Sequence, residues 1–289
     1  MATTNVIVVG VDGSESALNA ARWAAAEAKR RGLGLRVVHV WGVTGGYYGG
    51  GLPLPASAFD VLKQEAERVL DQAVEAARQT EPDLPVTGDM PCLAPIPHLV
   101  ELSRTARMIV LGSTGRGGFT GMLVGSTTVA VSTHAHCPVA VIRGQEHTGP
   151  VVVGIDGSQA GEPAIEAAFD AAAQREVPLV ALHVWSDLDY DSAFGSTRYL
   201  AGGEGLGEEE QRVLAEALAG WQEKYPDVVV QRVVLNDRPR HQLLEWSKRA
   251  ALVVVGCRGR GGFRGLLLGS TSQALIHHAE CPVLITRGS

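Results

Sequence analysis

A segment rich in glycine and hydroxyl side chains occurs twice in this chain. Residues 112–115 (GSTG) precede nine residues and then GST at 125–127, and residues 256–259 (GCRG) precede nine residues and then GST at 269–271. The copies lie 256 − 112 = 144 residues apart, and the same offset relates Asp12 to Asp156. Glycines let the main chain approach a ligand, and a helix that opens with Ser-Thr presents free N–H groups to an anion. The spacing predicts two phosphate-binding loops.

Short apolar segments alternate with segments of helical periodicity in both halves of the 289-residue chain. This pattern predicts parallel sheets covered by helices on both faces. We expect strands at 5–11, 35–41, 86–90, 108–111 and 139–142, with helices at 15–31, 59–79, 96–104 and 126–134. In the second half, strands are expected at 151–155, 179–185, 251–255 and 283–286. The predicted fold is α/β, with two tandem copies of a five-stranded, three-layer domain of flavodoxin-like order 3-2-1-4-5, at 1–145 and 150–289.

Parallel strands place ligands beyond their carboxyl ends, where the strand order reverses. Asp12 follows the first strand and Gly112 the fourth, so we expect both at one crevice, with Asp12 accepting hydrogen bonds from a ribose or base. Arg116 in the first half, and Arg258, Arg260 and Arg264 in the second, can neutralise phosphate charge. The glycines are also explained by tight turns and close helix–strand packing, and Asp-Gly-Ser also forms Asx-turns.

Several histidine, tryptophan and cysteine side chains have structural explanations. His39 and His183 are expected to be satisfied, buried histidines, and Trp41 and Trp185 to pack at the base of a loop. The four cysteines show no C-x-x-C spacing and are expected to be buried apolar side chains. The longest irregular segments, 42–55 and 186–207, follow the second strand of each half and are candidates for lids or interaction surfaces.

Bulk properties exclude several classes of function. A net charge of −6 argues against nucleic-acid or anionic-membrane binding, and no apolar stretch approaches the roughly 18 residues of a membrane span. Because the chain also lacks a secretory leader pattern, we expect a cytoplasmic protein. There is no Walker-type lysine loop, no G-x-G-x-x-G after the first strand and no G-x-S-x-G elbow.

The signature G-x2-G-x9-G-[ST] in both halves resembles the ATP-binding branch of the universal stress protein family. The GVDGS run after the first strand, HVW at the second and HCPV before the fifth in the first half are also similar. The resemblance implies ATP in each half, two per chain, with Mg²⁺ and with no metal ligands from side chains. It implies nucleotide contacts from Gly10, Val11, Asp12, Val40, Gly112, Gly115, Gly125, Ser126 and Thr127, and from Gly154, Ile155, Asp156, Val184, Gly256, Gly259, Gly269, Ser270 and Thr271.

The predicted function is nucleotide-dependent regulation in a stress response, without catalysis. The resemblance also implies a homodimer, and a regulatory protein partner is expected. Two alternatives stay open. One is a slow ATPase or nucleotide-transferring enzyme on the same loops, for which we find no positioned base beyond Asp12 and Asp156. The other is a nucleotide-free interaction module, against which the intact glycine motifs speak.

Overall fold

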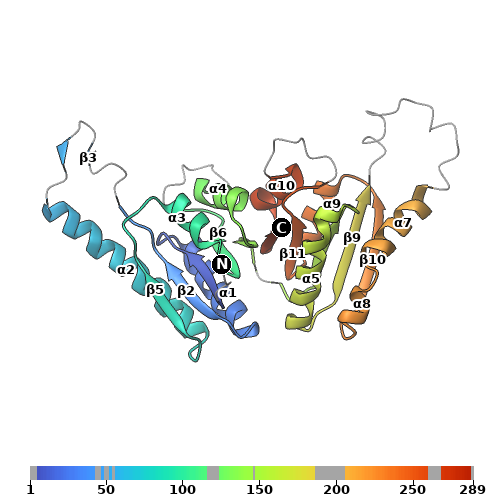
Figure 1. Cartoon of the computed structure of the whole chain (residues 1–289), viewed down its shortest axis with the longest axis horizontal. Helices are drawn as coiled ribbons and strands as arrows, with labels where there is room; N and C mark the ends of the chain where they lie inside the picture. The colour runs from blue at the N-terminus through green and yellow to red at the C-terminus, as the bar shows by residue number, and fades with distance from the viewer. Residues whose placement is uncertain are drawn as a thin grey trace. The chain divides into compact units, whose positions relative to one another are not determined.

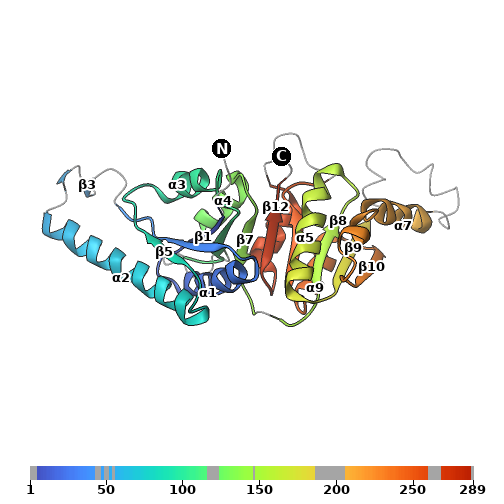
Figure 2. The same cartoon turned by 60° about the horizontal axis from the view of Figure 1, so that its bottom comes forward.

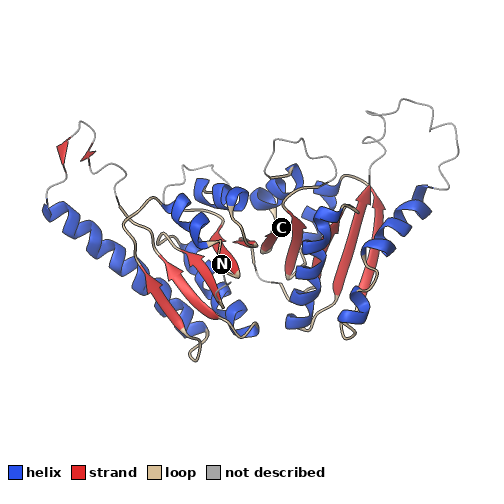
Figure 3. Cartoon of the chain, in the orientation of Figure 1, coloured by secondary structure: helices blue, strands red, loops and turns tan. Residues whose placement is uncertain are grey.

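The computed structural model describes residues 5–42, 47–48, 52–53, 56–115, 124–145, 147–185, 206–259 and 268–287 (Figure 1). The chain divides into two compact units, Met1–Arg143 (unit 1) and Gly144–Ser289 (unit 2). Each unit contains a five-stranded parallel sheet with helices between successive strands, as Figure 3 shows.

Unit 1 has the predicted strand order. Its strands are β1 (Val6–Gly10), β2 (Gly34–Val38), β3 (Tyr47–Tyr48), β4 (Leu52–Pro53), β5 (Val86–Asp89), β6 (Met108–Gly112) and β7 (Val139–Ile142). Its helices are α1 (Glu15–Arg30), α2 (Ala56–Thr80), α3 (Pro95–Leu102) and α4 (Ser126–His134). The sheet runs β5-β2-β1-β6-β7 with every pair parallel, which confirms the order 3-2-1-4-5. Helices α1 and α2 pack together on one face, and α3 and α4 on the other (Figure 2).

Unit 2 repeats this topology. Its strands are β8 (Val151–Ile155), β9 (Leu179–Trp185), β10 (Val230–Asn236), β11 (Leu252–Gly256) and β12 (Val283–Thr286). Its helices are the 3₁₀ helix η1 (Gln159–Gly161), α5 (Glu162–Arg175), α7 (Leu206–Ala217), α8 (Trp221–Lys224), α9 (Pro239–Ser247) and α10 (Ser270–His278). The parallel order β10-β9-β8-β11-β12 is again 3-2-1-4-5.

Small side chains bring helix α1 close to the sheet. Six of its buried residues are alanines: Ala17, Ala20, Ala21, Ala24, Ala25 and Ala28. Ser14 caps the helix, because its hydroxyl accepts a hydrogen bond from the N–H of Ala17 at 3.2 Å. This confirms the expected helix start and fixes the exit of the chain from β1.

The second strand of unit 1 is shorter than predicted. It ends at Val38, and Trp41 forms only an isolated bridge with Cys92, whereas β9 continues to Trp185. Pro91 explains the difference, since proline has no N–H to donate to a continuing ladder. Trp41 packs at the base of the following loop as expected, with its ring 5.1 Å from that of Phe59 and its indole N–H donating to the carbonyl of Met90.

The cysteine prediction was wrong at one position. Cys137, Cys257 and Cys281 are buried, but Cys92 is exposed because it lies beyond the end of the outer strand β5. The long loops largely lie outside the described residues. Within 42–55, β3 and β4 pair as a short antiparallel hairpin that the sequence analysis did not predict.

Candidate functional site

In unit 1 the loops after β1 and β6 meet at the carboxyl end of the sheet. The Asp12 carboxylate lies against the main chain of Gly115, where an added Cβ would sit 2.6 Å from Asp12 Oδ2. Any side chain at position 115 would therefore displace the carboxylate. The structure thus brings together the aspartate and the loop glycine that the sequence analysis assigned to one crevice.

Hydrogen bonds hold both loops in place. Asp12 Oδ1 accepts from the N–H of Ser14 at 3.0 Å, which is the Asx-turn considered for this aspartate. The Ser14 hydroxyl donates to the carbonyl of Thr114, and the N–H of Thr114 donates to Ser16 Oγ at 3.4 Å. The start of helix α1 therefore positions the glycine loop directly.

The N-terminus of helix α4 is tied to the same loop. The N–H of Gly125 donates to the carbonyl of Ser113 at 2.8 Å, and the Thr128 hydroxyl donates to the carbonyl of Gly112 at 2.8 Å. Among the described residues no side chain caps this helix, and Ser126 is exposed at its first turn. Because the first N–H groups of a helix have no intrahelical partner, this end favours an anion.

Gly112 serves packing. A Cβ at this position would lie 2.6–2.8 Å from atoms of Ser16, so helix α1 can cross β6 only where the side chain is absent. This is the close helix–strand packing that stood as the alternative explanation for the glycines. Gly115 is the loop glycine whose bare main chain faces Asp12.

Unit 2 reproduces the arrangement with different loop residues. A Cβ on Gly259 would lie 2.8 Å from Asp156 Oδ2, matching the contact in unit 1. The N–H of Gly269 donates to the carbonyl of Cys257 at 2.7 Å, and the Ser272 hydroxyl donates to the carbonyl of Gly256 at 2.8 Å. The backbone geometry is therefore kept although the central residues of the loop differ.

The helix that follows the first strand starts differently in the two units. In unit 2 the Ser158 hydroxyl donates to Asp156 Oδ1 at 2.7 Å and does not cap a helix. The short helix η1 comes next, and α5 begins only at Glu162. Asp156 consequently accepts two hydrogen bonds from Ser158, from its N–H and its hydroxyl.

The remaining predicted residues are placed as follows. Val40 and Val184 are partly buried near the same strand ends, Ser270 begins α10, and Arg258 is exposed. Arg116, Arg260 and Arg264 lie outside the described residues. The anchoring hydroxyls of Thr128 and Ser272 were not among the residues predicted from the sequence. The repeat contains a signal for them, because both copies carry a hydroxyl side chain at this position.

Within the described ranges, no group of three or more His, Cys, Asp or Glu side chains is arranged to hold a metal ion. None of the helices in these ranges is long and apolar enough to span a bilayer.

Fold and site together define a protein of two α/β units, each with a glycine loop and a helix N-terminus at the carboxyl edge of its sheet. The model of the universal stress protein family matches residues 3–143 and 148–287. The chain belongs to the universal stress protein family.

Relatives match the whole tandem arrangement. A universal stress protein of Mycobacterium tuberculosis is 41% identical over 292 residues, covering 98% of this chain and 97% of its own. A second one from the same species is 38% identical over 297 residues, covering 98% and 96%. The crystal structure of a universal stress protein from Archaeoglobus fulgidus is similar in fold, with a TM-score of 0.71, 19% identity and 98% of both chains covered.

Proposed function

We propose that each unit binds one ATP, with Mg²⁺ held by the phosphates, and that the nucleotide acts as a regulatory ligand in a stress response. The observation that carries the proposal is the paired contact of Asp12 with Gly115 and of Asp156 with Gly259. It joins a hydrogen-bond acceptor suited to a nucleoside and a bare backbone loop suited to phosphates, in both units.

The proposed contacts follow the chemistry of each residue. The carboxylates of Asp12 and Asp156 accept hydrogen bonds from the adenosine, beside the main chain of Gly10, Val11, Gly154 and Ile155 and the side chains of Val40 and Val184. The phosphates lie against Gly115 and Gly259 and at the helix N-termini that begin with Ser126 and Ser270. Arg116 and Arg260 are proposed to neutralise phosphate charge.

The proposal predicts that each chain binds two nucleotides. Calorimetric titration with Mg-ATP should give a stoichiometry of two, and nucleotide should be released when freshly purified protein is denatured. At about 100 times Kd each site adds roughly 2.7 kcal/mol of stability. Each kcal/mol raises the melting temperature of a domain this size by roughly 2–4 °C. A stoichiometry of one or zero would contradict the proposal.

A measurement of ATP turnover distinguishes a regulatory ATP-binding protein from a slow ATPase. We propose that ATP is a ligand, so ADP release by the purified protein should stay at the level of a Gly115→Asp, Gly259→Asp double variant. ADP release that exceeds this level would favour the enzyme alternative.

Self-association, a regulatory protein partner and a cytoplasmic location remain predictions. A homodimer of the 30.4 kDa chain should double the mass measured by light scattering. A mass that stays at one chain over a wide concentration range would contradict the dimer.

A further inference from the structure

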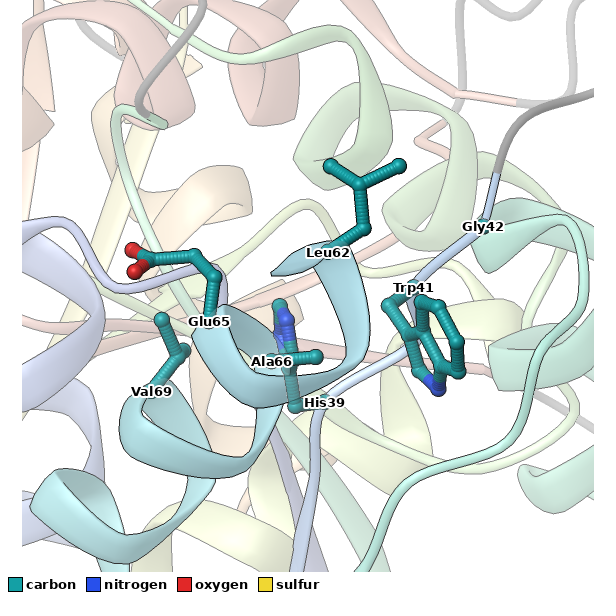
Figure 4. A pocket seen from close by; sticks show the side chains of 7 residues that line it. All are labelled: His39, Trp41, Gly42, Leu62, Glu65, Ala66 and Val69. Carbon is teal, nitrogen blue, oxygen red and sulfur yellow. The ribbon is translucent and has the colours of Figure 1, made fainter. Parts of the chain in front are cut away.

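Unit 1 has a pocket of about 170 Å³ between the end of β2 and helix α2 (Figure 4). Its walls include the imidazole of His39, the indole of Trp41 and the apolar side chains of Leu62, Ala66 and Val69. In Figure 4, His39 and Ala66 lie at the centre of the lining, with Trp41 on one side and Val69 on the other. These residues differ from those of the candidate nucleotide site.

His39 presents a hydrogen-bonding nitrogen to this pocket. Its Nδ1 lies 2.8 Å from the carbonyl oxygen of Val11 and therefore carries the proton that this acceptor receives. The other ring nitrogen, Nε2, has no hydrogen-bond partner among the described residues. In a neutral imidazole bonded in this way, Nε2 is an acceptor.

The equivalent position in unit 2 is filled by a carboxyl group. His183 Nδ1 lies 2.7 Å from the carbonyl of Ile155, and its Nε2 lies 2.6 Å from Glu210 Oε2. Both side chains are buried. The two positions correspond, because Glu210 follows His183 by 27 residues and Ala66 follows His39 by 66 − 39 = 27. Ala66, itself buried, thus leaves unit 1 without the carboxyl group that completes the pair in unit 2.

We propose that the unit 1 pocket binds a small monocarboxylic acid, whose carboxyl group pairs with His39 Nε2 as Glu210 pairs with His183. Binding of the carboxylate takes up one proton from solvent, which the carboxyl group and the imidazole then share, because the Nδ1 proton is already donated to the carbonyl of Val11. A short hydrocarbon tail packs against Leu62, Val69 and Trp41. A cavity of about 150 Å³ accommodates benzene, so an acid of about four carbons fits.

The charges around the pocket suit a single carboxyl group. Glu65 also lines it and forms an ion pair with Arg68 on the same helix. A dicarboxylate would place a second negative charge beside Glu65 or against the apolar wall, where burial of an unpaired charge is costly. The proposed class is therefore the short-chain monocarboxylic acids.

Butyrate is the probe. With ¹⁵N-labelled histidine, the Nε2 resonance of His39 should shift on titration with sodium butyrate and saturate in the millimolar range. Sodium chloride at equal ionic strength should have no effect. The Nε2 resonance of His183 is an internal control and should stay in place, because Glu210 already occupies its partner position. Absence of a saturable His39 shift would overturn the proposal.

Substitutions at Ala66 and Glu210 test whether the missing carboxyl group at position 66 is the reason that unit 1 binds the acid. Ala66→Glu should supply the carboxyl group internally and abolish the butyrate shift at His39, and Ala66→Met should abolish it by filling the volume. Glu210→Ala should create a second site, seen as a new butyrate-dependent shift at His183. Circular dichroism verifies that each variant folds. If the buried carboxyl group of Ala66→Glu prevents unit 1 from folding, the Ala66→Met variant still tests the placement. Unchanged butyrate binding in a folded Ala66→Met or Ala66→Glu variant would contradict this placement.

Discussion

The carboxylate of Asp12 lies against the backbone of Gly115, with Oδ2 only 2.6 Å from the position that a Cβ of residue 115 would occupy. The contact joins the loop after the first strand to the loop after the fourth strand of the same sheet. Its counterpart between Asp156 and Gly259 shows that the geometry is a property of the repeat. Substitutions in one unit can therefore be compared with the same substitutions in the other.

Replacing Gly115 by Asp should abolish nucleotide binding in unit 1 and leave unit 2 unaffected. The new carboxylate would meet Asp12 and would repel phosphates, while the loop can adjust because the clashing atom is a side-chain oxygen. The calorimetric stoichiometry should fall from two to one, and Gly259→Asp should give the complementary loss. Gly207→Asp is a matched control, since no atom of the described residues lies within 4 Å of a Cβ there. Two intact sites in Gly115→Asp would place the phosphates elsewhere.

Asp12→Asn separates the charge of this side chain from its structural hydrogen bond. The amide oxygen can still accept from the N–H of Ser14, so helix α1 should start as before and the melting temperature of the ligand-free protein should change little. Asp12→Glu moves the carboxylate outward and should displace the nucleoside from unit 1. Equal ATP affinity of unit 1 in the wild type and in Asp12→Glu would show that this carboxylate does not contact the adenosine.

Thr128→Val tests the anchoring of helix α4. The variant keeps the shape of the side chain but leaves the carbonyl of Gly112 without its hydroxyl donor, which should cost about 1–3 kcal/mol. ATP affinity of unit 1 should fall as well, because the helix N-terminus loses its position. Thr133→Val is the control, since that hydroxyl donates to the carbonyl of Val129 within the same helix. Denaturant unfolding and calorimetry measure both effects, and equal affinities in the two variants would contradict the anchoring role.

The cysteines should differ sharply in reactivity. Burial raises the pKa of the Cys281 thiol to about 12, so at pH 8 almost none of it is the reactive thiolate. Cys92 is exposed. Iodoacetamide at pH 8 should therefore label Cys92 first in the native protein and Cys281 only after unfolding, as peptide mass mapping would show. Early labelling of Cys281 would mean that unit 2 opens readily near β12.

Much of the fold could be predicted from local patterns. The runs of buried valine, leucine and isoleucine identified the strands, and the alternation with helices implied a parallel sheet of order 3-2-1-4-5. The repeat offset paired Asp12 with Asp156 and each glycine loop with its copy. These inferences hold because hydrophobic periodicity and turn chemistry act over a few residues, and right-handed crossovers restrict the topology.

Other features were decided only by the tertiary structure. From the sequence, Gly112 could either contact a ligand or allow close packing of a helix on its strand. The approach of Ser16 to the backbone of Gly112 shows the packing role. The histidine of the HVW motif has the same sequence context in both halves. Nevertheless, His183 forms a hydrogen bond with Glu210, whereas His39 lines a pocket together with Ala66. Such contacts join segments far apart in the chain. They depend on how each helix lies on its sheet and which side chain fills the space between them, and no local pattern carries that information.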